Sequence, residues 1–253
     1  MMRKVFLADW KRAVLSVGFL AGVIGLVLAG ICSTLPAVTY VQENMVLGSR
    51  AKCSFLIEAA VHSDLILMVI PLVSSLAYGA AFSDELKYRF AMSGLVRTSW
   101  RRYLGSKVLV TALSGGLMVL IGLLLILGRI TLAFLPGQEQ WIPSGESVFL
   151  YFADLAGRMV FLCLSGSLWA LLGGFSAAVM KNKYMAYTTP FILYYVLDTF
   201  QKRYYPTLDI LNPREWASPV VIQTWHAGLM LSLAGLAVGV AYMTAMERRL
   251  KDV

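Results

Sequence analysis

The segment 82–107 carries the residues whose types and spacing most clearly suggest a chemical role. It reads FSDELKYRFAMSGLVRTSWRRYLGSK and lies between two long apolar stretches. Its charged residues are six bases and two acids, namely Lys87, Arg89, Arg97, Arg101, Arg102 and Lys107 with Asp84 and Glu85. The segment is too long for a tight turn and too rich in aromatic residues for a disordered linker. We therefore expect a folded, basic, amphipathic surface that is offered to a cytoplasmic partner.

The remaining residue types argue against catalysis by this chain. No Gly-Lys dipeptide occurs, so there is no Walker A loop to hold phosphates, and there is no HExxH motif. The only histidines, His62 and His226, have no evident partner in the sequence. The cysteines Cys32, Cys53 and Cys163 form no CxxC pair, which favours apolar packing over a disulfide framework or a metal site. We expect a protein that is not an enzyme and binds no metal or cofactor itself.

Two pairs of opposite charges are spaced for contact on one helix face. Asp154 and Arg158 are four residues apart, as are Asp198 and Lys202. Opposite charges at this spacing form surface ion pairs on helices. We expect ion pairs at the ends of membrane helices, with coupling-ion sites as the alternative.

The charged segment and the ion pairs lie between or at the ends of long apolar stretches, which we expect to be helices. The chain of 253 residues is 58% apolar and 14% charged, against about 25% charged in an average soluble domain. Its mean hydropathy is +0.71. A membrane span needs roughly 20 apolar residues, and six stretches qualify or nearly qualify, at about 13–35, 64–82, 107–128, 157–180, 184–200 and 225–246. None carries a charge near its middle, which would be costly in lipid. The pattern predicts an all-α membrane protein with six transmembrane helices in a single membrane domain, 1–253.

The net charge of +8 follows from the membrane topology. With the N-terminus inside, most of the Lys and Arg residues fall in cytoplasmic segments, as the positive-inside rule requires. This distribution predicts a multi-pass protein of the cell membrane with both termini in the cytoplasm, and no nucleic-acid partner. The first apolar stretch is longer than the core of a signal peptide, so we expect an uncleaved span.

Shorter elements are predicted around the spans. Residues 1–12 have the pattern of a helix lying in the membrane interface. Residues 51–61 are apolar enough for a short helix, and the Pro and aromatic residues of 201–224 favour short broken helices. Residues 181–183 join the fourth and fifth spans as a helix hairpin. The glycine pairs Gly18/Gly22 and Gly235/Gly239 favour close helix packing within the chain, with a dimer contact as the alternative.

The chain resembles the permease subunits of ABC-2 type exporters. The architecture is similar over nearly the whole length. The sequence similarity lies in Phe82-Ser83-Asp84-Glu85, in Thr98-Ser99-Trp100-Arg101-Arg102-Tyr103-Leu104, in Ser106-Lys107 and in the short run Leu211-Asn212-Pro213. Trp100 interrupts the Ser-Arg step that the family commonly shows.

The resemblance implies that residues 82–107 form coupling helices that dock on a separate ATP-binding cassette subunit. That subunit would bind ATP and Mg. Glu85, Arg101 and Arg102 would contact it through charge, and Phe82, Trp100 and Tyr103 would supply the anchor. The alternative is that these basic residues only fix the topology and contact membrane lipid.

The resemblance further implies that two permease subunits, identical or related, enclose a pathway lined by spans one, two and five. The candidate lining residues are Ser74, Ser75, Tyr78, Thr188, Thr189, Tyr194 and Tyr195. Such uncharged hydroxyl and aromatic groups suit an amphipathic cargo, such as a hydrophobic peptide, a lipid-linked molecule or a drug. The alternative role for these groups is hydrogen bonding between helices.

Other functions remain open at this point. A motor-independent transporter or an immunity factor would act without an ATPase partner and would tolerate substitution in 82–107. A membrane enzyme acting on lipid would need a clustered nucleophile and base. An ABC importer subunit would show a different coupling motif.

Overall fold

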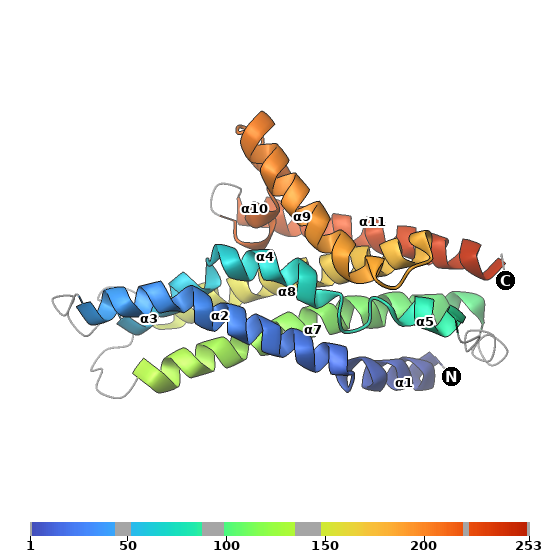
Figure 1. Ribbon diagram of the computed structural model, residues 1–253, viewed down its shortest axis with the longest axis horizontal. Helices are drawn as coiled ribbons and strands as arrows, with labels where there is room; N and C mark the ends of the chain where they lie inside the picture. Colours follow the sequence, from blue (N-terminus) through green and yellow to red (C-terminus); the bar gives the residue numbers. More distant parts are fainter. Residues whose placement is uncertain (1, 44–51, 88–98, 135–147, 220–222, 252–253) are drawn as a thin grey trace.

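The computed structural model describes residues 2–43, 52–87, 99–134, 148–219 and 223–251 (Figure 1). The regular elements in these ranges are all helices. In chain order they are α1 (Met2–Val14), α2 (Val17–Glu43), α3 (Lys52–Val61), α4 (Asp64–Ser74), α5 (Ala81–Lys87), α7 (Trp100–Phe134), α8 (Val148–Met180), α9 (Met185–Tyr204), the 3-10 helix η1 (Asp209–Leu211), α10 (Pro213–Ala217) and α11 (Thr224–Lys251).

Four of these helices, α2, α7, α8 and α11, are long and apolar enough to cross a membrane. Residues Ser54–Val61 of α3 and Asp64–Ser74 of α4 form a pair bent by 51°, which makes a fifth candidate if the pair counts as one span. The fold is therefore all-α, with several helices able to span a bilayer. The prediction of six spans is not confirmed. The predicted span 184–200 corresponds to α9, whose C-terminal part carries Asp198, Lys202 and Arg203 and which is not among the candidates.

The predicted span 64–82 is interrupted. Helix α4 ends at Ser74, residues 75–80 form turns, and α5 begins at Ala81. Gly79 falls within the turns and is a weaker helix former than the aliphatic residues of α4. Hydrogen bonds from Gly79 N to Ser75 O at 2.9 Å and from Ala81 N to Tyr78 O at 3.1 Å are among those that stabilise this region. Because of this interruption α5 does not continue α4. Tyr78 lies against Lys107 of α7, and α5 packs against α8.

A bend at Ser16 separates α1 from α2. The Ser16 hydroxyl accepts a hydrogen bond from Phe19 N at 3.0 Å and so caps α2, while it donates to Ala13 O at 2.8 Å. A side-chain oxygen that satisfies a free N–H in this way stabilises the start of a helix. The predicted helix at 1–12 is thus present and packs along α7, whereas its position in a membrane interface stays a prediction.

The hydrophobic core lies where α2, α4, α7 and α8 pack together. Gly18 and Gly22 allow this packing, because a Cβ on Gly18 would lie 2.2 Å from Leu76 O and one on Gly22 would lie 2.2 Å from Met118 Sδ. This glycine pair therefore packs within the chain. In the second pair, a Cβ on Gly235 would meet no atom within 4 Å, and one on Gly239 would lie at an ordinary 3.4 Å from Val108 Cγ1.

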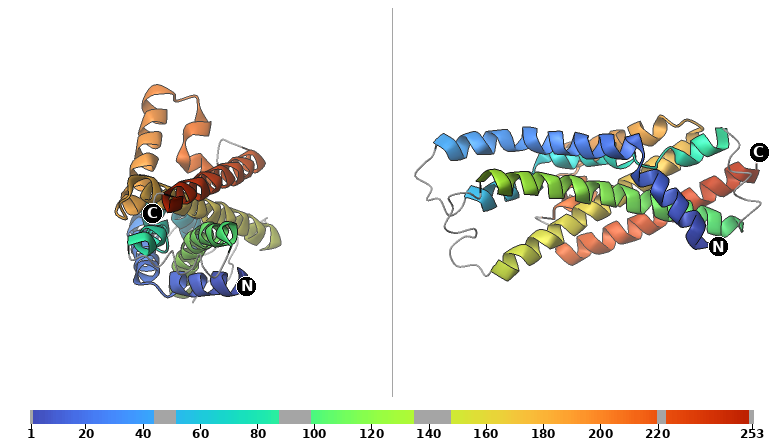
Figure 2. Two further views of the ribbon diagram at one scale, coloured as in Figure 1. Left: turned by 90° about the vertical axis from the view of Figure 1, so that its right-hand side faces the viewer. Right: turned by 90° about the horizontal axis from the view of Figure 1, so that it is seen from below.

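The long helices run roughly along one axis and form an elongated bundle (Figures 1 and 2). Both termini, α5 and the turn between α8 and α9 lie at one end. The C-terminal ends of α2 and α7, with α3, lie at the opposite end. Helix α9 leans away from the other helices in Figure 1 and in the left view of Figure 2. Residues 181–184 join α8 to α9 as the predicted hairpin, and α3, η1 and α10 confirm the short helices expected at 51–61 and in 201–224.

Candidate functional site

Lys107 is buried at the end of the bundle that holds both termini. It lies two turns into α7 and is 1% exposed. Its ammonium group donates to Glu85 Oε1 at 2.6 Å, to Tyr78 OH at 2.8 Å and to Asp9 Oδ1 at 2.9 Å. An ammonium group has three N–H donors, so all of them are used by these contacts.

Glu85 on α5 shares this buried position. Its Oε1 atom also accepts from Arg12 on α1 at 3.0 Å, and its Oε2 atom accepts from the Tyr103 hydroxyl at 2.5 Å. The Arg12 side chain is largely exposed and covers the carboxylate from the solvent side. The rings of Tyr78 and Tyr103 each have their centroid 5.3 Å from Lys107 Nζ, which is within the range of cation–π attraction.

We call this group of residues the charge cluster, consisting of Asp9, Arg12, Tyr78, Glu85, Tyr103 and Lys107. It contains two carboxylates and two basic groups, so its formal charges balance. Buried charges are tolerated when each is paired and hydrogen-bonded, and removing one partner typically costs about 3–5 kcal/mol. The cluster therefore holds α1, the 75–80 turns, α5 and α7 in one arrangement.

A hydrophobic cluster adjoins the charge cluster and seats α5 on the long helices. Phe82, Tyr103 and Leu104 pack against buried residues of α8 and α11, among them Tyr242 and Met246. Trp100 is half-buried at the edge of the same group. Both ends of the segment 82–107 are thus fixed to the helix bundle.

The structure separates the six residues predicted to contact a partner. Phe82, Glu85 and Tyr103 are buried within the chain, Trp100 is half-buried, and Arg101 and Arg102 are exposed. Glu85 pairs with Lys107 and Arg12 and makes no ion pair with Arg101 or Arg102. Residues 88–98, including Arg89 and Arg97, lie outside the described residues.

The predicted pathway residues also divide by exposure. Ser74, Ser75, Tyr78 and Tyr194 are buried, Thr189 is half-buried, and Thr188 and Tyr195 are exposed. Ser75 donates to Leu72 O at 3.3 Å, and the Tyr194 ring packs edge-on against Trp169 at 5.8 Å between centroids. The buried pathway residues thus pack against other helices of the same chain, whereas the exposed ones, Thr188 and Tyr195, lie on α9.

A second set of polar contacts lies at the opposite end of the bundle. Arg214 on α10 forms ion pairs with Asp64 on α4 and, at 2.9 Å, with Asp198 on α9. Burial alone would lower the pKa of Arg214, but the hydrogen bond to Asp64 and the charges of Asp198 and Asp64 raise it. Helix α10 is thereby tied to both α4 and α9.

The two predicted i,i+4 pairs are confirmed at this same end. Arg158 Nε lies 2.7 Å from Asp154 Oδ2, and Lys202 Nζ lies 2.9 Å from Asp198 Oδ2. Arg158 also contacts His62, whose Nδ1 atom is 2.7 Å from the Ser218 hydroxyl. The histidine thus joins the α3–α4 bend to α8 and to the residue that follows α10.

Sequence reasoning did not foresee the charge cluster as a unit. Asp9 is the only acid among the first 14 residues, which are otherwise basic and apolar, and Lys107 directly precedes a long apolar run. Two signals could have suggested a buried pair. Asp9 is an isolated acid among basic residues, and Lys107 lies at the start of an apolar stretch. Their partnership depends on how α1 and α7 pack.

No protein-family model matches the chain, and comparison with curated proteins and with solved structures found no match.

Proposed function

We propose that this chain is the membrane-spanning permease subunit of an ATP-driven exporter of the ABC-2 type. The proposal includes a separate ATP-binding cassette subunit that docks on the segment 82–107. In this proposal the chain lies in the cell membrane, with both termini and the segment 82–107 at the cytoplasmic face.

The observation that supports the proposal best is the charge cluster beneath the segment. A partner can drive a membrane helix only if the surface that it touches moves together with that helix. Lys107 and Glu85 join α5 to α7 at 2.6 Å, and Lys107 and Asp9 join α7 to α1 at 2.9 Å. Because these pairs are buried, displacing α5 would displace α1 and α7 with it.

The exposed residues of the segment define the surface that we assign to docking. Arg101 and Arg102 begin α7 and face outward, beside the half-buried Trp100. Charged groups at the rim of an interface set orientation and partner choice, and a neighbouring aromatic group supplies buried area. In this arrangement Arg101 and Arg102 contact the partner, whereas Phe82, Glu85 and Tyr103 stabilise the surface from within.

Two copies of this chain, or this chain and a related one, would enclose the pathway. Helix α9 leans away from its own bundle (Figure 1) and exposes Thr188 and Tyr195. Hydroxyl and aromatic groups of this kind suit an amphipathic cargo better than a small ion. ATP and Mg belong to the partner subunit in this proposal, because the sequence lacks a Walker A loop.

The test is gentle purification of the tagged chain from its native membrane, followed by mass spectrometry of the proteins that accompany it. A stoichiometric partner with Walker A and Walker B motifs is the expected result, and a second six-span partner would indicate a heteromeric pathway. A chain that is repeatedly isolated alone, and that still transports in liposomes without ATP, would overturn the proposal in favour of a motor-independent transporter.

A further inference from the structure

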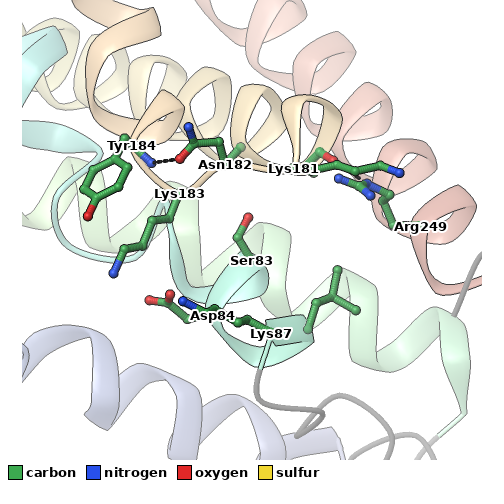
Figure 3. Close-up of a pocket in the computed structure, with 11 residues that line it drawn as sticks. Ser83, Asp84, Lys87, Lys181, Asn182, Lys183, Tyr184 and Arg249 are labelled. Atoms are coloured by element: carbon green, nitrogen blue, oxygen red, sulfur yellow. Dashed lines mark hydrogen bonds between the residues drawn. The ribbon is translucent and has the colours of Figure 1, made fainter.

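A basic groove lies beside the charge cluster, between α5 and the turn that joins α8 to α9. Its volume is about 620 Å³. Its polar lining side chains include Ser83, Asp84, Lys87, Lys181, Asn182, Lys183 and Arg249. Figure 3 shows that α5 contributes Ser83 and Lys87 on one side, while residues 181–183 and Arg249 of α11 lie on the other. Three separate parts of the chain therefore converge on one space.

The charge in this groove is strongly unbalanced. Four basic side chains line it, and Asp84 is the only acid among the lining residues. Within the described ranges, no carboxylate forms an ion pair with Lys181, Lys183 or Arg249. A concentration of positive charge in a concave site favours an anionic ligand.

Hydrogen-bond donors remain for such a ligand. Arg249 uses its Nε–H on Ala178 O at 2.8 Å, and a guanidinium group has five N–H donors in all. The Asn182 carbonyl oxygen accepts from Tyr184 N at 3.0 Å, which leaves the amide NH₂ group as a donor. Charge-assisted donors of these kinds are well suited to phosphate oxygens.

A second cavity, with a mainly apolar surface, continues from the groove. A second space of about 480 Å³ lies between α8 and α11 and shares Ala178, Lys181 and Arg249 with the first. Its other lining residues are Phe175, Val179, Ala241 and Ala245, which offer carbon surface, together with the polar Thr244 and Arg248. A ligand that fits both spaces therefore combines a negatively charged group with hydrocarbon.

We infer that the basic groove binds the headgroup of an anionic phospholipid, with an acyl chain in the cavity between α8 and α11. Basic pockets between membrane helices on the cytoplasmic side bind anionic headgroups of this class. The inference uses the orientation proposed above, with this end at the cytoplasmic face, and is independent of any ATP-binding partner. The bound lipid would bridge α5, the α8–α9 turn and α11.

The experiment measures lipid binding to the purified full-length chain by native mass spectrometry. Phosphatidylglycerol is titrated against phosphatidylcholine, and inorganic phosphate is added as a competitor. The double variant Lys181→Gln/Lys183→Gln removes two charges from the groove. Its control, Lys11→Gln/Lys251→Gln, removes two charges from exposed positions at the same end of the bundle.

We expect the unmodified protein to bind phosphatidylglycerol selectively. This binding should weaken on the order of 20-fold in the groove variant and stay unchanged in the control. Equal losses in both variants would assign the binding to general surface charge and overturn the inference. Equal affinity for phosphatidylcholine, or displacement of the lipid by inorganic phosphate alone, would also overturn it.

A second variant tests the acyl-chain cavity without changing charge. Thr244 is exposed on α11 and lines that cavity. Thr244→Trp should fill the space and weaken retention of phosphatidylglycerol while leaving the melting temperature of the protein unchanged. Unaltered retention in this variant would contradict the placement of the acyl chain. Because neither assay needs a motor subunit, their outcome is separate from that of the proposed export function.

Discussion

Lys107 of α7 and Asp9 of α1 form a buried ion pair of 2.9 Å across 98 positions of sequence. Glu85 of α5 joins the same ammonium group at 2.6 Å. The N-terminal helix, the start of the segment 82–107 and the helix that follows it therefore meet at one lysine. The following predictions concern this junction, the surface above it and the packing that supports it.

Lys107→Met should destabilise the protein by about 3–5 kcal/mol, because it leaves the carboxylates of Asp9 and Glu85 buried without their shared partner. The free energy of unfolding, obtained by denaturant titration in detergent, measures this loss. Lys11→Met on the exposed face of α1 is the control and should change stability by less than about 0.5 kcal/mol. Equal stability of the two variants would show that the charge cluster does not hold the helices together.

The pairing of Asp9 with Lys107 can be isolated by a double-mutant cycle. Asp9→Asn and Lys107→Met, measured singly and together, should show an interaction energy of about 0.5–3 kcal/mol, as expected for contacting residues. Additive effects would mean that the two residues stabilise the protein independently. The same cycle with Asp154→Asn, which lies at the opposite end of the bundle, should be additive with Lys107→Met.

Arg101→Glu/Arg102→Glu should uncouple ATP hydrolysis from transport while leaving membrane insertion intact. Both residues are exposed at the start of α7, so reversing their charge alters the proposed docking surface and not the core. ATPase activity and cargo export are measured in parallel on the reconstituted complex. Lys202→Glu/Arg203→Glu at the C-terminal end of α9 carries the same charge change and should keep coupling. Normal coupling in the Arg101/Arg102 variant would reject these residues as the contact.

Gly18→Ala should destabilise the packing of α2 on the α4–α5 connection by about 1–3 kcal/mol. A Cβ at this position would lie 2.2 Å from the backbone oxygen of Leu76, which cannot move aside as a side chain can. Gly235→Ala on α11 is the matched control, since its Cβ would meet no atom within 4 Å. Because alanine is the better helix former, the control should stabilise the protein by up to about 1 kcal/mol. Thermal unfolding followed by tryptophan fluorescence compares the two, and a similar shift in both would contradict the close contact.

Arg214→Gln should loosen the C-terminal half of α9. Arg214 ties α10 to Asp64 and Asp198, and among the described residues its removal leaves Asp198 with Lys202 as its one ion-pair partner. Hydrogen exchange of the amides of residues 195–204 should become faster in this variant. Lys202→Gln removes a single exposed pair worth about 0.2–1 kcal/mol, so its exchange pattern should stay close to that of the unmodified protein. Unchanged exchange after Arg214→Gln would show that packing alone positions α9.

The elements that the sequence predicted correctly are those decided by neighbouring residues. Long apolar stretches became α2, α7, α8 and α11, because hydrophobicity and helix formation are properties of a continuous segment. The short helices α3 and α10 and the ion pairs Asp154–Arg158 and Asp198–Lys202 followed from local composition and from a four-residue spacing. The predicted span 64–82 is not one continuous helix, because hydropathy does not register the turns at 75–80.

The charge cluster required the tertiary structure. The sequence identified the segment 82–107 and drew attention to Glu85, but it could not show that Glu85 points inward or that Asp9 and Lys107 meet it. A charged residue can face solvent or a buried partner with the same local sequence, and the choice depends on which helices pack beside it. The sequence by itself therefore determined a helical, membrane-type chain with a basic end. The packing of α1, α5 and α7 alone decided which of its charges became a buried junction and which stayed on the surface.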